Sequence, residues 1–83
     1  MLNKFDFVQS LLEFYLECVG NPEQVADMSY VQNGGEWIYV TFESGDQKRF
    51  CVNGDSNQGI LQDFCKFLRY FDDYEWLRES EKR

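Results

Sequence analysis

The sequence predicts an α+β domain in which a three-stranded antiparallel sheet packs against two helices, in the order α-β-β-β-α. Apolar residues recur with the 3.6-residue period of a helix near both ends of the chain. Between these segments, apolar and polar residues alternate with the two-residue period of strands, and glycine-containing turns separate the alternating runs. We therefore expect one domain over residues 1–83, with the N- and C-terminal helices packed on one face of the sheet.

Residues 3–19 should form the first helix. Asn3 can cap its N-terminus, and Gly20 provides a left-handed stop after its last turn. The Asn21-Pro22 pair resembles a second helix start, although the residues after it leave room for only a turn or two. The apolar stripe of the first helix consists of Phe5, Val8, Leu12, Tyr15, Leu16 and Val19.

Three strands should follow, at residues 28–32, 36–43 and 47–52. The first is the weakest pattern and the second is the strongest. Along 36–43, odd-numbered and even-numbered residues should face opposite sides of the sheet. The turns at 33–35 and 44–46 contain glycine, which adopts positive φ at low cost, so the sequence predicts a meander of two hairpins.

The last helix should begin after a cap at Asp55 or Ser56. Two readings of its C-terminal end stay open. Either one long helix continues past Asp72 and Asp73, or the helix breaks near Asp72 and a short extra C-terminal helix comes after the break. The apolar stripe of the last helix consists of Ile60, Leu61, Phe64, Phe67, Leu68 and Phe71.

The composition argues against most catalytic chemistry. The chain has no histidine, which removes Ser-His-Asp and Cys-His arrangements and histidine-ligated metals. Residues 53–57 begin like a calcium loop, but Gln58 replaces the required glycine and Phe64 the bidentate glutamate. No phosphate-binding glycine motif occurs. We expect no enzymatic activity, no metal and no cofactor.

The three cysteines, Cys18, Cys51 and Cys65, are widely spaced and odd in number, which does not fit a disulfide framework. Because each has apolar neighbours in the sequence, we expect buried, reduced thiols. The N-terminal residues lack the apolar core of a signal peptide, and no apolar run approaches the length of a membrane span. These features predict a cytoplasmic protein.

The charge of the chain predicts a basic protein partner. Fifteen acidic residues against eight basic ones give a net charge of −7, and the basic residues are scattered. Such a chain is repelled by nucleic acid and by anionic membranes, so we expect neither as a direct partner. The bland alternative is that the acids only keep the chain soluble. The candidate partner-binding residues are Glu43, Asp46, Asp72, Asp73, Tyr74 and Glu75.

The element order looks like that of a double-stranded-RNA-binding domain, but residues 55–59 lack the basic cluster with which that family contacts phosphates. A second pattern consists of the strands at 37–42 and 49–52, the helix with Asp63, Phe64 and Phe67, and the acidic run at 72–75. In this pattern the chain resembles small acidic anti-CRISPR proteins of phages and mobile elements.

This resemblance implies an inhibitor whose carboxylates stand in for DNA phosphates in the basic groove of an RNA-guided nuclease. Two other functions stay open at this point. The chain is also compatible with an interaction module, such as a regulatory subunit or an immunity protein that neutralises a basic nuclease toxin. A homodimeric protein of unknown role, with its spare aromatic residues at the dimer interface, is the third.

Overall fold

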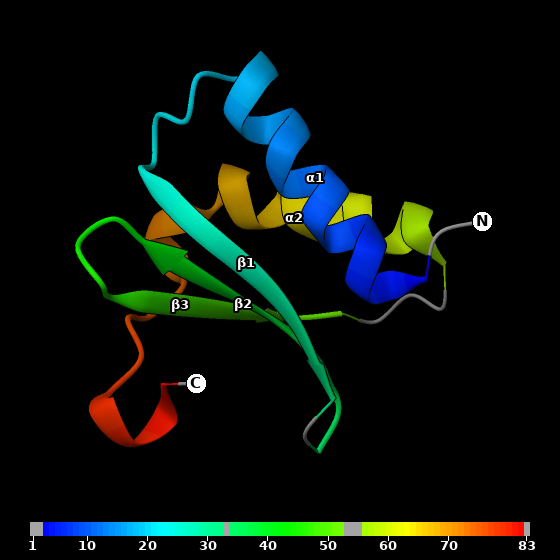
Figure 1. The fold of residues 1–83 in the computed structure, drawn as a ribbon. Helices are drawn as coiled ribbons and strands as arrows, with labels where there is room; N and C mark the ends of the chain where they lie inside the picture. The colour runs from blue at the N-terminus through cyan, green and yellow to red at the C-terminus, as the bar shows by residue number, and fades with distance from the viewer. Residues whose placement is uncertain (1–2, 33, 53–55, 83) are drawn as a thin grey trace.

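The computed structural model describes residues 3–32, 34–52 and 56–82, and its elements follow the predicted order (Figure 1). The predicted α+β class is confirmed, because two helices flank a three-stranded antiparallel sheet. No helix in the described ranges is long and apolar enough to cross a membrane. The elements are α1 (Lys4–Cys18), β1 (Val25–Gln32), β2 (Glu36–Phe42), β3 (Gln47–Cys51), α2 (Asn57–Arg69) and two 3-10 turns, η1 (Phe71–Asp73) and η2 (Glu79–Glu81).

Both helices start at the predicted kind of cap. The Asn3 side chain accepts a hydrogen bond from the Asp6 backbone N–H, and the Ser56 side chain accepts one from that of Gly59. These bonds satisfy N–H groups that have no partner inside the helix. Asp55, the alternative cap for α2, lies outside the described residues.

Strand β1 begins at Val25, three residues before the predicted start of the first strand. The reason lies in Asn21, which does not start a helix but adopts a φ of 54°. Its side-chain amide accepts from the Val25 N–H at 2.7 Å and donates to the Val25 carbonyl at 2.9 Å. Asparagine tolerates this backbone conformation and replaces a backbone pairing partner, so the turn leads directly into the strand.

The sheet has the order β1-β2-β3, and both helices pack on the same face (Figure 1). Even-numbered residues of β2 point toward the helices, and Ile38 and Val40 are fully buried there. Aromatic rings join the layers: Tyr15 of α1 meets Phe64 of α2 edge-on at 5.6 Å between centroids. The core is therefore built from the even-numbered face of β2 and the inner faces of α1 and α2.

Helix α2 ends at Arg69, which decides between the two readings of the C-terminal region. The break near Asp72 occurs, and the short structure at that point is the 3-10 turn η1. The chain then passes the edge of β3 and reaches the opposite face of the sheet, where η2 lies below the strands in Figure 1. We call residues 74–82 the C-terminal strap.

The C-terminal strap is attached to β3 by backbone and side-chain contacts. The Leu77 N–H donates to the Gln47 carbonyl at 2.8 Å. A Glu81 carboxylate oxygen lies 3.8 Å from a guanidinium nitrogen of Arg49, and the Lys82 ammonium lies 3.5 Å from a carboxylate oxygen of Asp46. The strap therefore covers the outer edge of β3, which would otherwise present unpaired backbone groups.

The prediction of buried cysteines is wrong, because all three thiols are exposed. Cys51 lies on β3 next to Phe50, and neighbouring strand residues point to opposite faces. Cys65 follows the buried Phe64 on α2, and one helical step turns its side chain toward solvent. Cys18 is the last residue of α1. Apolar neighbours in the sequence therefore did not place these residues on the apolar face.

Candidate functional site

Carboxylates from three separate segments gather at one end of the molecule. The Glu43 backbone N–H donates to the Gln24 carbonyl at 2.9 Å, which joins the turn between β2 and β3 to the loop between α1 and β1. Glu23 precedes Gln24 in that loop, and it lines the same groove as Asp72 and Asp73 of η1. We call Glu23, Glu43, Asp72 and Asp73 the acidic end.

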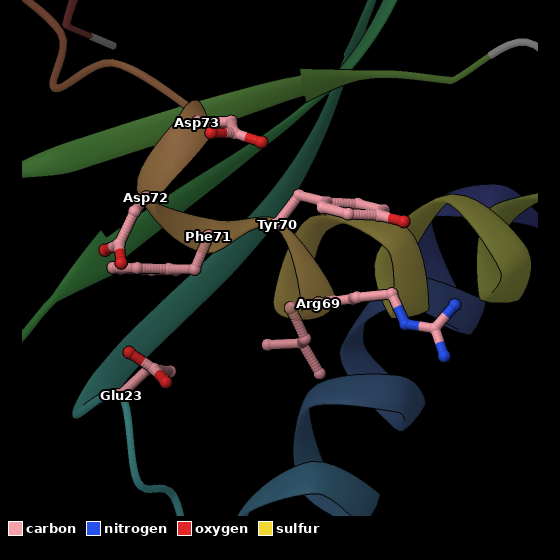
Figure 2. A pocket seen from close by; sticks show the side chains of 7 residues that line it. Glu23, Arg69, Tyr70, Phe71, Asp72 and Asp73 are labelled. Carbon is pink, nitrogen blue, oxygen red and sulfur yellow. The ribbon is translucent and has the colours of Figure 1, made fainter.

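The groove at the acidic end is open and holds about 510 Å³ (Figure 2). Glu23 and Asp72 lie on one side of it in Figure 2, whereas the Arg69 guanidinium points away along α2. The basic residue in the lining therefore does not cover the carboxylates. The lining residues are Glu23, Leu68, Arg69, Tyr70, Phe71, Asp72 and Asp73.

A buried lysine lies close to this groove. Lys48 of β3 is only 2% exposed, and its ammonium donates to the Phe71 carbonyl at 2.9 Å. The same ammonium lies 3.8 Å from the centre of the Phe71 ring and 4.5 Å from that of Trp76. Burial lowers the pKa of Lys48 below its usual value, while the negative charges of Asp72 and Glu23 act in the opposite direction.

The position of Lys48 follows from the strand period. Lys48 and Phe50 are both even-numbered residues of β3, opposite Val40 and Ile38 of β2. The alternation therefore places Lys48 on the helix-covered face, which is unusual for a charged side chain. Sequence reasoning missed this residue, although the signal was present in the register of the third strand.

The other predicted site residues are distributed differently. Asp46 is in the turn next to Glu43, but its carboxylate contacts Lys82 of the strap. Tyr74 is half-buried and packs edge-on against Phe67 at 4.9 Å between ring centres. Glu75 lines a separate hollow with Trp37 and Arg49, on the strap side of β3. The acidic end thus brings together Glu43, Asp72 and Asp73, and it adds Glu23.

The chemistry that this arrangement supports is the binding of cationic groups. Exposed carboxylates accept hydrogen bonds from guanidinium and ammonium donors, and two adjacent carboxylates match a forked guanidinium well. Within residues 3–32, 34–52 and 56–82, no three Cys, Asp or Glu side chains are arranged to hold a metal ion.

Comparison of the chain with family models, with curated proteins and with solved structures found no match. The function is therefore inferred from the residues and from their placement in the fold.

Proposed function

We propose that the protein is a non-catalytic acidic inhibitor, made by a phage or mobile element, that occupies the nucleic-acid-binding groove of a host defence nuclease. The observation that supports this proposal is the acidic end, where Glu23, Asp72 and Asp73 share one open groove and Glu43 lies in the adjoining turn. Three distant parts of the sequence contribute these carboxylates, so their proximity is a property of the fold.

Carboxylates can replace DNA phosphates because the same donors recognise both. Nuclease grooves that read a duplex present arginine and lysine side chains, and arginine forks bind carboxylate and phosphate in the same bidentate geometry. The overall charge of −7 adds a long-range attraction to such a groove. The charge thus favours encounter with the groove, and the local carboxylates favour docking in it.

Aromatic side chains beside the acidic end supply apolar contact area. Tyr70, in the groove, is 46% exposed, and Trp76, which packs on Phe71 and Phe42, is 51% exposed. Exposed aromatic residues next to charges are typical of protein interfaces, where the rings contribute contact energy and the charges contribute orientation and rate. A surface that only keeps the protein soluble has no need of such rings.

The test uses the guide-loaded RNA-guided nuclease of the host and a short duplex that carries its recognition motif. The protein should prevent binding of the duplex, and excess duplex should displace the protein, because both occupy the same groove. Simultaneous binding of the protein and the duplex to the nuclease would contradict the phosphate-mimic mechanism. A lack of any effect on the nuclease would leave the interaction module as the better function.

That second function, an interaction module or homodimer, is favoured by a different observation. An apolar hollow of about 270 Å³ lies where α1 meets α2, and its lining includes Phe14, which is 61% exposed, and Leu61. Sedimentation tests the homodimer. A dimer in the parent that dissociates in Phe14→Ser would favour the homodimer, whereas a monomer in both would count against it.

A further inference from the structure

The two edges of the sheet are treated differently. The edge of β3 is covered by the C-terminal strap, through the hydrogen bond from Leu77 to Gln47. Along β1, which is the longest strand, the Asn21 and Gln9 side chains bond the outer backbone groups of Val25 and Met28. No group in the described part of the chain bonds the outer backbone groups of Tyr30 and Gln32. An uncovered edge strand is a template for another strand. The contrast identifies β1 as the edge that is available for pairing.

The register shows which backbone groups of β1 point outward. The Phe42 N–H donates to the Asp46 carbonyl, and the Val52 N–H donates to the Glu36 carbonyl. The backbone groups of even-numbered β2 residues therefore form hydrogen bonds on the β3 side. The backbone groups of odd-numbered β2 residues therefore form hydrogen bonds with β1, where Tyr39 is opposite Ser29. By the same alternation, the backbone groups of Met28, Tyr30 and Gln32 point away from the sheet. The Gln9 side chain donates to the Met28 carbonyl at 2.6 Å, which agrees with this assignment.

A groove of about 250 Å³ runs beside this edge, between α1 and β1. Phe5 and Tyr30 line it, with their rings edge-on at 4.9 Å between centroids. The Tyr30 hydroxyl donates to Glu36, which also pairs with Lys4, and these bonds hold the Tyr30 ring in place. Asp6 also lines the groove and is exposed. The groove thus has one exposed aromatic wall, Phe5, over the buried Tyr30 ring, and one carboxylate without an ion-pair partner among the described residues.

The charges at this edge decide which strand fits. A second copy of the chain would bring another charge of −7 to it and would oppose Asp6 and Asp27 with further carboxylates. An extended segment with an arginine or lysine would instead place its alkyl stem on the exposed Phe5 ring, since Tyr30 is buried and Lys4 already lies 5.7 Å from the centre of its ring. Its cationic group would then lie near Asp6.

We propose that β1 receives an extended, basic segment of a partner protein as a fourth strand, with an arginine or lysine side chain in the groove between α1 and β1. Backbone hydrogen bonds to Tyr30 and Gln32 hold the segment, and the Phe5 and Asp6 side chains select its basic residue. Gln9 releases the Met28 carbonyl when the segment binds. This surface does not depend on the acidic end being a binding site.

The probe is an eight-residue peptide of alternating valine and threonine with one central arginine. In the free protein, the Ser29 and Val31 amides should exchange slowly with solvent, and those of Tyr30 and Gln32 quickly. The arginine peptide should slow exchange at Tyr30 and Gln32. The same peptide with alternate N-methylated amides should not, because it cannot form the ladder.

Matched variants test the selection of the basic residue. Asp6→Asn should weaken binding of the arginine peptide by roughly fivefold, as expected for an exposed ion pair, while Glu17→Gln on the same helix should leave it unchanged. Equal affinity for a glutamate-containing peptide would overturn the basic specificity. Unchanged Tyr30 and Gln32 exchange at saturating peptide would overturn the strand addition. Slow exchange there in the free protein, together with a dimer mass in sedimentation, would assign the edge to a second copy instead.

Discussion

At the residue scale, Lys48 connects the core of the protein with its acidic end. A buried ammonium group is costly unless it is hydrogen-bonded and has counter-charges nearby. Here the Phe71 carbonyl supplies the hydrogen bond, two aromatic rings face the charge, and Asp72 and Glu23 are the nearby acids. Two residues of the acidic end therefore have a structural role in addition to their proposed role in binding.

Replacing Lys48 with methionine tests this balance. Because burial lowers the pKa of Lys48, the native state disfavours the charged form relative to the unfolded state. Lys48→Met should therefore raise the free energy of unfolding by about 1 kcal/mol near neutral pH. As the pH rises through the lowered pKa toward 10.5, Lys48 loses its proton in the native parent before it does so in the unfolded parent. The free energy of unfolding of the parent therefore rises, and the difference between the parent and Lys48→Met should shrink.

Urea denaturation of both proteins between neutral pH and about pH 10.5 measures the effect. The control is Lys66→Met, since Lys66 is exposed on α2, and its free energy of unfolding should change by less than about 0.5 kcal/mol. If Lys48→Met is less stable than the parent at neutral pH, the contacts with Phe71, Trp76 and the acids outweigh the cost of burial.

The cysteines provide a second prediction at this scale. All three thiols are exposed, so an excess of an aromatic disulfide reagent should label them in the native protein without prior unfolding. Added denaturant should then increase the number of labelled thiols little, if at all. Slow labelling that becomes complete only on unfolding would show that the thiols are buried, as the apolar sequence neighbours had suggested.

At the element scale, the parts that were predictable are those whose pattern is local. The helix period, with a cap at Asn3 and another at Asp55 or Ser56, predicted α1 and α2, and the alternation predicted β2. Strand β1 was predicted too short because its register shifts between Val25 and Asp27, which interrupts the alternation at its start. The strap has no period at all, and its path depends on contacts with β3 that are distant in the sequence.

The strap leads to a prediction about local stability. Trp76 anchors it by packing on Phe42, with 5.1 Å between ring centres, and by facing Lys48. The Leu77 amide should therefore exchange slowly in the parent and several-fold faster in Trp76→Ala, as measured by NMR-detected hydrogen exchange. Phe14→Ala removes an exposed ring from α1 and should leave Leu77 unchanged. Rapid exchange of Leu77 in the parent would mean that the strap is not held against β3.

At the scale of the whole molecule, the composition gives the acidic charge but not the shape of the surface that carries it. Glu43 was visible as part of an acidic stretch, residues 21–47, that contains no basic residue, and Asp72 and Asp73 were visible with Glu75 as a dense acidic cluster. The sequence did not show that these carboxylates lie close to Glu23, because that proximity depends on the hydrogen bond between Glu43 and Gln24, which joins two loops. Asp46 is the opposite case. It was a predicted partner-binding residue, but its carboxylate lies close to Lys82, which is distant in the sequence.

The final prediction separates the acidic end from the overall charge. Glu43→Lys with Asp73→Lys reverses two carboxylates of the acidic end, and Glu13→Lys with Glu17→Lys reverses two exposed carboxylates of α1 by the same total charge. Asp72 is left in place because a lysine there would repel the buried Lys48. Both double variants should keep the parent's circular dichroism spectrum.

If the acidic end docks in the basic groove of the nuclease, the first variant should lose binding, while the second should only associate more slowly. The parent's association rate should fall about tenfold between about 0.05 and about 0.5 M salt, because screening removes the long-range attraction. Stopped-flow measurements with the nuclease follow both effects. Equal losses of binding in the two variants would show that net charge alone drives the association. If the first variant binds as tightly as the parent at low salt, the acidic end is not the docking surface.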